Sequence, residues 1–269
     1  MSDDTRAALI LGASSGFGEA TARAFAAEGY DIYGVHLDRR SGLEHVEEIK
    51  EDLKGHGVRA RYFNRNAADE DKRADTLDEI LEEVGEGGLK VLLHSLAFGT
   101  LVPFVGEEAG DGVSPKQMDM TLDVMAHTLV YWTQGVVHRG LMGTGGRIFA
   151  MTSSGGDRVA PAYGPVSAAK AALESHCRQL ALELADREIT VNAIRAGVTD
   201  TPALRKIPGS DVMVEQAEAN NPHGRLTQPE DVADCMVTLA GPGTHWMTGN
   251  VIRVDGGEDW VMAGAGAGS

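Results

Sequence analysis

A glycine-rich turn between an apolar run and a helical pattern is the feature that most constrains the fold of this chain. Ala7–Leu11 is a short, fully apolar run typical of a buried strand, and the residues after Gly18 repeat apolar side chains at helical spacing. Gly12, Gly16 and Gly18 form the pattern G-x3-G-x-G, which lets the backbone turn tightly and approach a pyrophosphate at a helix N-terminus. The same glycines would also suit a tight turn alone, but their place in a strand–turn–helix–strand unit favours a dinucleotide site.

Short β-rich runs alternate with helical patterns along the rest of the chain. Strands are expected at Ala7–Leu11, Ile32–His36, Val58–Phe63, Val91–His94, Arg147–Met151, Thr190–Ile194 and Val251–Val254. Helices are expected at Gly18–Glu28, Glu44–Lys54, Glu70–Val84, Met118–Met142, Ala168–Ala185 and Pro229–Leu239. This alternation predicts an α/β fold with a single Rossmann-type doubly wound parallel sheet flanked by helices. We expect one dinucleotide-binding, catalytic domain over residues 1–262 and a disordered Gly/Ala tail over residues 263–269.

Composition excludes several classes of function. The net charge of −16 makes nucleic acid and anionic membranes poor partners, and no apolar run approaches the ~20 residues that span a membrane. Two cysteines inside helical patterns form no disulfide framework, which suits a reducing compartment, and we expect a cytoplasmic protein. The nine histidines are scattered without cysteine or carboxylate at ligand spacing, so no metal site is expected.

The expected cofactor contacts begin in the glycine turn and continue at the end of the second strand. In the turn they are expected from Gly12, Ser14, Ser15, Gly16, Phe17 and Gly18. In the stretch GVHLDRRSG, His36 stands at the strand end and Asp38 follows, where an acid would bind both ribose hydroxyls and favour NAD. Arg39 and Arg40 come next, and two guanidinium groups can bracket a 2′-phosphate. We therefore expect NADP(H) to be preferred, with NAD(H) and a merely solvated charge run as the alternatives.

The stretch YGPVSAAK places Tyr163 seven residues before Lys170. A tyrosine and a lysine at this spacing share one helix face, and the pair is either catalytic or a coincidence of helical spacing. Pro165 indicates that Tyr163 lies where the chain enters the helix, because proline suits the first helical turn. The glycine turn and Ser153 on the preceding strand favour a catalytic pair.

Several motifs in order resemble the short-chain dehydrogenase/reductase family from Ala7 to about Val261. They are GASSGFG, HSLAFG after the fourth strand, the serine-bearing MTSS, the Tyr–Lys pair, NAIRAGVTDT and GNVIRVDGG. The resemblance implies a Rossmann-type sheet, a nicotinamide cofactor, a cytoplasmic location and a homotetramer.

Three departures from the common pattern of that family agree with one another. Ser167 stands where the lysine of Tyr-x3-Lys would be, the stretch His94–Ala97 replaces the usual NNAG, and Asp123 replaces the mid-helix asparagine. All three resemble bacterial enoyl-acyl-carrier-protein reductases. The glycine turn combined with Tyr-x6-Lys resembles their NADPH-preferring third type, as does TDTPALRKIPG. Ser153 occupies the position of a second tyrosine found in the commonest of these enzymes.

A chemical hypothesis explains why the lysine follows the tyrosine by seven positions instead of four. Reduction of a ketone delivers hydride to the carbon that bears the oxygen, so the proton donor must lie beside the reactive carbon of the nicotinamide. Reduction of a 2-enoyl thioester delivers hydride to the β-carbon, while negative charge develops on a carbonyl oxygen two carbons away. With Lys170 fixed on the cofactor ribose, a tyrosine one helical turn earlier stands several ångströms further off, since each residue rises about 1.5 Å.

The resemblance assigns a role to each remaining candidate residue. Tyr163 would hydrogen-bond the developing enolate oxygen, and Lys170 would hold the ribose and ease proton donation. Ser153 would either give a second hydrogen bond or satisfy backbone groups at the strand end. Further cofactor contacts are expected from Asn66, Ala67, Ser95, Ala97, Gly197, Val198, Thr199 and Thr201. Asp123 is interpreted as an ordinary helix aspartate and His94 as a hydrogen-bonded histidine at a strand end.

A long segment, about residues 199–225, is a candidate substrate lid. Its apolar residues would suit an acyl chain or a packed turn; they are Ala203, Leu204, Ile207, Val212 and Met213. The chain is therefore expected to reduce the 2,3 double bond of an enoyl thioester borne by acyl-carrier protein or coenzyme A. The alternatives are a 3-ketoacyl or carbonyl reductase, an alcohol dehydrogenase of the same family, and a cofactor-binding protein without turnover.

Overall fold

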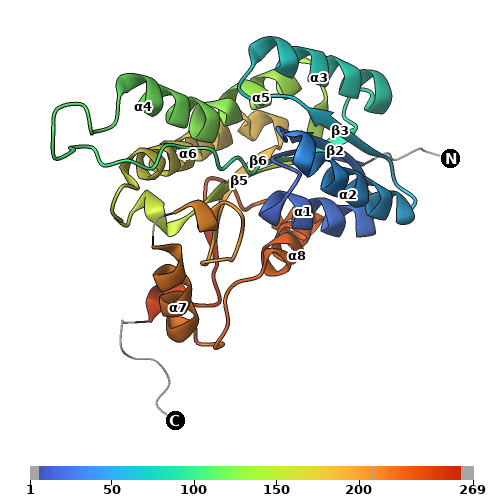
Figure 1. The fold of residues 1–269 in the computed structure, drawn as a ribbon. Coiled ribbons are helices and arrows are strands. Elements are labelled where there is room, and N and C mark those ends of the chain that lie inside the picture. Colours follow the sequence, from blue (N-terminus) through green and yellow to red (C-terminus); the bar gives the residue numbers. More distant parts are fainter. Residues whose placement is uncertain (1–5, 208, 262–269) are drawn as a thin grey trace.

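Seven parallel strands form one central sheet in the computed structural model, which describes residues 6–207 and 209–261 (Figure 1). The strands are β1 (Ala7–Leu11), β2 (Asp31–His36), β3 (Ala60–Asn64), β4 (Leu89–His94), β5 (Met142–Thr152), β6 (Thr190–Ala196) and β7 (Val251–Val254). Their order across the sheet is β3-β2-β1-β4-β5-β6-β7, so the direction of winding reverses between β1 and β4. In such sheets ligands bind outside the carboxyl ends of the strands at this reversal.

Helices cover both faces of the sheet. They are α1 (Gly16–Ala27), α2 (Leu43–Gly55), α3 (Glu70–Val84), α4 (Pro115–Leu122), the π-helical turn η2 (Asp123–His127), α5 (Thr128–His138), α6 (Gly164–Glu183), α7 (Ser210–Asn220) and α8 (Pro229–Ala240). Short 3-10 turns are η1 (Arg40–Gly42), η3 (Ser154–Gly156), η4 (Ala185–Arg187), η5 (Leu204–Lys206), η6 (Pro242–Thr244) and η7 (Glu258–Trp260). The expected α/β fold with a doubly wound parallel sheet is confirmed.

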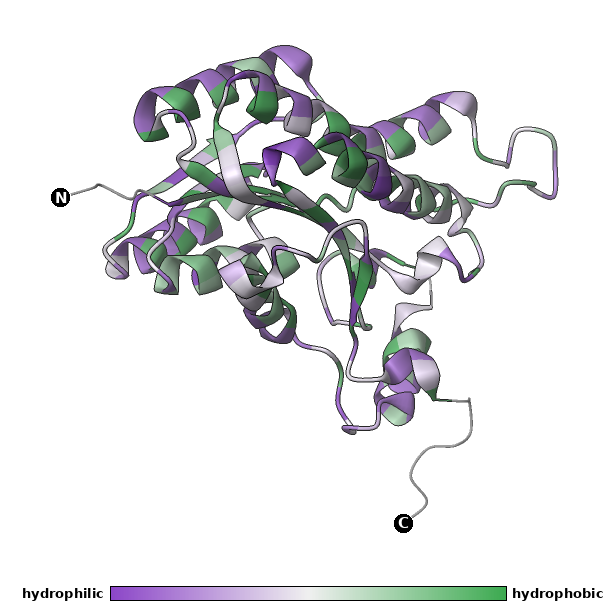
Figure 2. Ribbon diagram, turned by 180° about the vertical axis from the view of Figure 1, so that it is seen from behind, coloured by the Kyte–Doolittle hydropathy of each residue, from purple (hydrophilic) through white to green (hydrophobic). Residues whose placement is uncertain are grey.

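The core consists of two apolar layers, one on each face of the sheet. One layer joins strand residues to α3, α5 and α6 through side chains such as Leu77, Trp132 and Leu173. The other joins the sheet to α1, α2 and α8 through side chains such as Phe25 and Met236. All five residues of β1 are buried, because both faces of this strand are covered, and apolar residues concentrate in the central strands (Figure 2).

Several expected element boundaries are wrong. The helix expected over Met118–Met142 is in fact α4, the π-helical turn η2 and α5, and it ends at His138. Gly140 follows with φ of +65°, a left-handed conformation that ends helices, and β5 then begins at Met142 rather than Arg147. The tail expected over residues 263–269 lies outside the described residues, as does residue 262.

Two other boundaries changed because of local turn chemistry. Helix α6 begins at Gly164 instead of Ala168, since Pro165 fits its first turn. Helix α7 forms inside the segment interpreted as a candidate substrate lid, and Gly209 precedes it with φ of +79°. The predicted lid therefore carries a helix of its own.

Candidate active site

The glycine turn approaches its neighbours so closely that side chains are excluded from it. A Cβ on Gly18 would lie 2.0 Å from the Gly12 carbonyl oxygen, and Gly16 adopts φ of +53°. Helix α1 begins immediately after Ser15, whose side chain makes no capping hydrogen bond. Ser15 therefore leaves the first N–H groups of α1 uncapped, at the helix end that favours an anion. This arrangement fits a dinucleotide pyrophosphate.

Two other predicted segments meet this turn. A Cβ on Gly12 would lie 2.3 Å from the Ser95 carbonyl oxygen, and the Ser95 N–H donates to Leu11 O at 2.9 Å. A Cβ on Gly16 would lie 3.4 Å from Thr201 Cγ2. The fold therefore brings together the turn, the stretch after β4 and the stretch after β6, all at the carboxyl edge of the same parallel sheet.

The end of β2 holds Asp38 in a fixed position. His36 is buried, and its Nδ1 lies 2.8 Å from Asp38 Oδ2. Asn64 at the end of β3 binds the Asp38 backbone twice, at 3.1 Å to the N–H and 3.0 Å to the carbonyl. Arg39 and Arg40 are exposed, and within the described residues neither makes a side-chain hydrogen bond. The strand end thus presents two free guanidinium groups next to a carboxylate that already has a partner.

Tyr163 is the N-cap residue of α6 and packs against the turn that follows β5. A Cβ on Gly155 would lie 2.3 Å from Tyr163 Cε1 and 3.3 Å from Ser153 Oγ. Burial raises the pKa of the Tyr163 hydroxyl, and the neighbouring Ser153 hydroxyl opposes part of this rise. Ser153 Oγ is buried without a hydrogen-bond partner among the described residues. A buried hydroxyl left free beside a protonated tyrosine suits two donors aimed at one ligand oxygen.

Lys170 is buried in α6, two turns after Tyr163. Its Nζ donates to Met151 O on β5 at 2.7 Å. Burial lowers the pKa of Lys170 to about 8, and Glu174 one turn later opposes the shift. Glu174 itself accepts from Thr152 Oγ1 at 2.7 Å. One ammonium hydrogen bond is therefore used by the protein, and the remaining donors can serve a ligand.

His94 is buried at the end of β4 and is neutral. Its Nε2 lies 2.8 Å from Thr128 Oγ1, which donates to Val124 O at 2.8 Å, so the Nε2 carries the proton. Burial and the positive charge of Lys170 lower the pKa of His94 to about 3. This fits the expected hydrogen-bonded histidine. Asp123 begins the π-helical turn η2, a helix irregularity that occurs often at functional sites.

The remaining predicted cofactor contacts lie along the same edge. Asn66 is exposed, and its side chain accepts from Ala68 N at 3.1 Å. Ala67 is buried, and its carbonyl accepts from Trp132 Nε1 at 2.9 Å, so this carbonyl already has a donor. Ala97 is exposed after β4. Thr199 is buried and its hydroxyl donates to Gly197 O at 3.1 Å.

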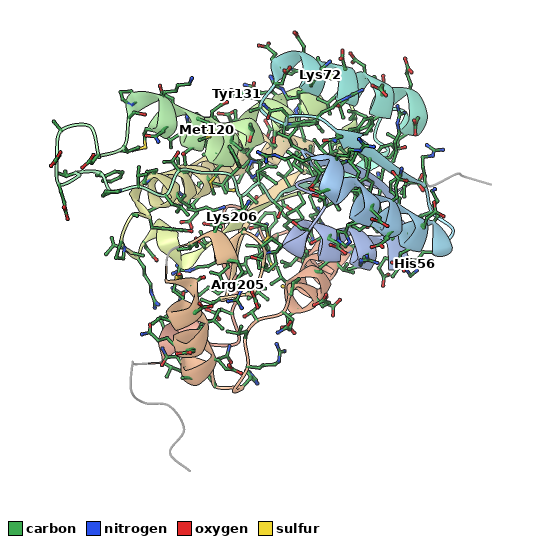
Figure 3. All side chains as sticks on the ribbon, in the orientation of Figure 1. His56, Lys72, Met120, Tyr131, Arg205 and Lys206 are labelled. Atoms are coloured by element: carbon green, nitrogen blue, oxygen red, sulfur yellow. The ribbon has the colours of Figure 1, made fainter. Side chains whose placement is uncertain are left out.

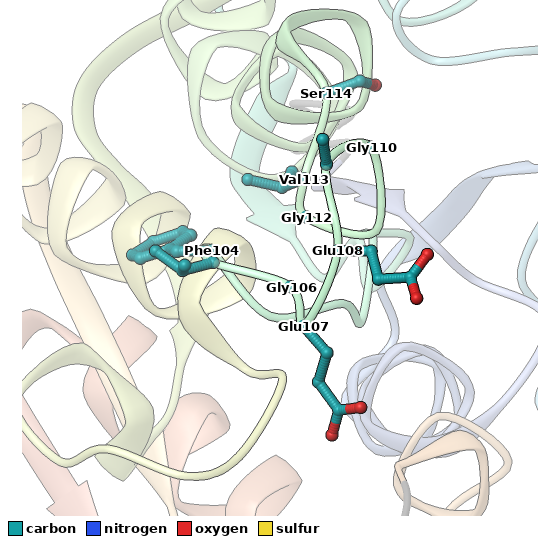
Figure 4. Close-up of a pocket in the computed structure, with 10 residues that line it drawn as sticks. Phe104, Gly106, Glu107, Glu108, Gly110, Gly112, Val113 and Ser114 are labelled. Atoms are coloured by element: carbon teal, nitrogen blue, oxygen red, sulfur yellow. The ribbon is translucent and has the colours of Figure 1, made fainter.

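Apolar residues are exposed beside the tyrosine. The loop over residues 98–114 exposes Phe98, Phe104 and Val105, and Figure 4 shows Phe104 turned toward α6 while Glu107 points away. A Cβ on Gly164 would lie 2.6 Å from Phe104 Cζ, so this ring lies on the first residue of α6. Val159, in the turn before Tyr163, is also exposed. Figure 3 shows Arg205 and Lys206 on the segment that precedes α7, within the predicted lid.

Sequence reasoning missed an ionic group behind the site. Arg195 on β6 is buried and binds both Asp157, before the tyrosine, and Asp259, near the end of the described chain. Glu258 accepts from Val198 N at 3.0 Å. An arginine inside the strand pattern NAIRAG was the available signal, since a buried guanidinium needs hydrogen-bond acceptors and is most often paired with a carboxylate.

Neither a metal-binding group nor a membrane-crossing helix is found in residues 6–207 and 209–261. No cluster of three or more histidine, cysteine or acidic side chains could hold a metal ion there. Every helix in the same ranges is too short or too polar to cross a membrane.

A family of known sequences matches almost the whole of this arrangement. The family described as "Enoyl-(Acyl carrier protein) reductase" matches residues 12–258, from the glycine turn to the segment after β7. The chain belongs to the short-chain dehydrogenase/reductase family. It is therefore an oxidoreductase, and the matching family carries the description of enoyl-acyl-carrier-protein reductases.

Individual relatives represent two activities. The reductase is 31% identical to the enoyl-[acyl-carrier-protein] reductase [NADH] of Aquifex aeolicus, covering 78% of this chain and 76% of that protein. It is 32% identical to a 3-oxoacyl-[acyl-carrier-protein] reductase of Aggregatibacter actinomycetemcomitans, covering 93% of this chain and 97% of that one. The crystal structure of the Aquifex enoyl reductase superposes with a TM-score of 0.81 at 27% identity, over 95% of this chain and 96% of the other.

Proposed function

We propose that this reductase uses NADPH to reduce the 2,3 double bond of an enoyl thioester. The observation that carries the proposal is the position of Tyr163 as N-cap of the helix that also buries Lys170, with a free Ser153 hydroxyl beside it. The tyrosine thus precedes the regular helix, and the lysine follows it seven positions later. The family described as enoyl-acyl-carrier-protein reductase supports the same reaction.

The cofactor would be held along the carboxyl edge of the sheet. Its pyrophosphate fits the uncapped N-terminus of α1 above Gly12, with Thr201 beside Gly16. Its adenosine half fits between the ends of β2 and β3, at His36, Asn66 and Ala67, and its nicotinamide half fits against residues 197–199. When bound, the nicotinamide supplies the hydride that reduces the β-carbon of the substrate.

The protein's own residues manage the charge that develops on the substrate. The thioester carbonyl oxygen becomes negative as the double bond is reduced, and the Tyr163 hydroxyl donates a hydrogen bond to it. Because burial raises the pKa of Tyr163, the hydroxyl stays protonated and available as a donor at neutral pH. Ser153 Oγ supplies the second donor, and Lys170 holds the ribose and its positive charge favours proton donation by the tyrosine.

The preference for NADPH rests on the end of β2. Arg39 and Arg40 are exposed, whereas the Asp38 carboxylate is engaged by His36 and its backbone by Asn64. A guanidinium pair binds a 2′-phosphate well, because each guanidinium offers several donors to phosphate oxygens. The relative from Aquifex is named as an NADH enzyme, so the cofactor must be tested on this chain itself.

The acyl chain would lie between the loop over residues 98–114 and the predicted lid over residues 199–225. Phe98, Phe104, Val105 and Val159 expose apolar surface next to Tyr163. Such surface suits an acyl group carried by acyl-carrier protein or coenzyme A. A cytoplasmic homotetramer remains the proposed state of the enzyme.

The test is oxidation of NADPH by the purified reductase with two matched thioesters, one 2-enoyl and one 3-keto. We expect turnover of the enoyl substrate only, and a loss of at least 10²-fold in kcat in Tyr163→Phe, since general acid catalysis contributes about that much. The 32% identity to a 3-oxoacyl reductase favours the second candidate, reduction of a 3-ketoacyl thioester. Turnover of the keto substrate alone would establish that candidate and contradict the first.

A further inference from the structure

The last described residues of the chain touch both loops that flank the proposed nicotinamide position. Glu258, in η7, places Oε2 at 3.0 Å from Val198 N, and a Cβ on Gly197 would lie 2.9 Å from the same oxygen. Arg253 on β7 stacks over the Trp260 ring at 4.3 Å, which fastens the segment over residues 255–260 to the sheet. The segment over residues 255–260 is therefore held against β7 while it contacts the loop after β6.

Arg195 links the same segment to the loop before Tyr163. Its Nη1 and Nη2 donate to the two carboxylate oxygens of Asp157, both at 2.8 Å. Its Nη2 also lies 2.9 Å from Asp259 Oδ2, and the side chain of Asp259 is only 5% exposed. Arg158 adds a hydrogen bond to Asp259 O at 3.1 Å and an ion pair to its carboxylate at 3.3 Å.

The loop held in this way carries backbone strain. Ala162, directly before Tyr163, has φ of 60°, a left-handed conformation unfavourable for a residue with a Cβ. A strained residue of this kind persists only where surrounding contacts fix it. The bidentate bond between Arg195 and Asp157 is a contact of that strength, because paired guanidinium–carboxylate bonds fix orientation as well as distance.

We propose that the segment over residues 255–260 is a positioning element of the active site, through Glu258 on the loop after β6 and Asp259, via Arg195, on the loop before Tyr163. The proposal rests on the proposed function, which places the nicotinamide half of the cofactor at residues 197–199. Neither acid needs to touch the substrate. Glu258 fixes the loop proposed to hold the nicotinamide, and Asp259 fixes the loop that leads to Tyr163, so both are positioning residues.

The first experiment compares Glu258→Ala with Glu258→Gln, using the dissociation constant for NADPH measured by nucleotide fluorescence. Glutamine keeps a carbonyl oxygen that can accept from Val198 N, whereas alanine removes the acceptor. We expect about tenfold weaker binding for alanine and a change within about twofold for glutamine, because a lost hydrogen bond to a charged group is worth about that factor. Glu82→Ala, an exposed acid in α3, is the matched control for loss of charge.

Unchanged NADPH affinity in Glu258→Ala would overturn the role of Glu258, and so would equal weakening by glutamine and alanine. If the wild-type protein binds neither NADPH nor NADH, the proposed function fails, and this arm of the inference fails with it. Thermal unfolding of each variant is recorded first, so that only folded protein enters the comparison.

The second experiment measures amide hydrogen exchange over residues 153–163 and needs no cofactor. Asp259→Asn keeps the shape of the side chain and removes the charge that binds Arg195. We expect at least fivefold faster exchange in residues 153–163, with unchanged exchange in β1 and in the Glu82→Ala control. Exchange over residues 153–163 at the wild-type rate would show that Asp259 does not hold this loop, whatever the enzyme reduces.

Discussion

Lys170 keeps its positive charge in a place where burial opposes it. Its pKa falls to about 8, so the side chain loses its proton within the pH range in which the enzyme can be assayed. The ammonium is the group proposed to hold the cofactor ribose, and only its cationic form donates three hydrogen bonds. The affinity for NADPH should therefore depend on pH through this one residue.

We expect kcat/KM for NADPH to be level below about pH 8 and to fall above it, approaching tenfold per pH unit, because this ratio reports the free enzyme. In Lys170→Arg the fall should disappear up to about pH 10, since arginine stays charged. A fall at the same pH in the arginine variant would assign it to another group.

The lowered pKa of Lys170 also predicts how stability changes with pH. The wild-type free energy of unfolding should rise with pH between about 8 and 10.5, where the unfolded lysine retains more protons.

Ala162 provides a second prediction at the scale of one residue. Its left-handed backbone, with φ of 60°, costs an L-residue about 1–2 kcal/mol, and glycine does not bear this cost. Glycine is more flexible than alanine in the unfolded state, and this offsets part of the gain. Ala162→Gly should therefore raise the free energy of unfolding by about 1 kcal/mol in urea denaturation. Ala160→Gly, two residues earlier with an ordinary backbone, should instead lower it slightly. Equal effects of the two substitutions would mean that no strain is stored at Ala162.

At the scale of elements, the first turn of α1 gives the most direct test of the proposed cofactor site. A Cβ on Gly18 would lie 2.0 Å from the backbone oxygen of Gly12, which cannot move without opening the turn. Gly18→Ala should therefore weaken NADPH binding by at least 10²-fold and lower the melting temperature. Gly55→Ala, at the end of α2 with no atom within 4 Å of its Cβ, should leave binding unchanged and stabilise the protein slightly. NADPH binding is measured by fluorescence titration, and melting curves are recorded for both variants. Normal NADPH affinity in Gly18→Ala would contradict the proposal that this turn binds the pyrophosphate.

Most elements and the close approach of the chain at the glycine turn could be predicted from the sequence, for identifiable reasons. Apolar runs such as Ala7–Leu11 and the glycine turn are local signals, so β1 and the start of α1 were placed within two residues. The π-helical turn between α4 and α5 was missed, because the stretch over residues 118–142 keeps helical spacing in its apolar residues. The contacts of Arg195 with Asp157 and Asp259 were missed because they join residues far apart in sequence.

At the scale of the whole molecule, the order of the strands determines where a ligand can bind. The winding reverses between β1 and β4, and the residues that follow β1, β4 and β6 converge there, as the close approaches of Gly12 and Gly16 show. The sheet itself is apolar on both faces and specifies no reaction. Relatives that are similar over most of this chain include both enoyl and 3-oxoacyl reductases, as expected where the reaction depends on residues in the loops at one edge and not on the fold.

This dependence on one edge gives a last prediction about the stability of the whole protein. A ligand that binds only the folded state stabilises it by about 2.7 kcal/mol at a concentration of one hundred times its Kd, which for a chain of this size raises the melting temperature by roughly 5–10 °C. Because Arg39 and Arg40 would bind the 2′-phosphate, NADPH should raise the melting temperature more than NADH at equal concentration, and the difference should shrink with added salt. In Arg39→Ala/Arg40→Ala the two cofactors should give equal shifts. A larger shift with NADH in the wild-type protein would indicate that Asp38 at the end of β2 binds a ribose hydroxyl. The enzyme would then prefer NADH.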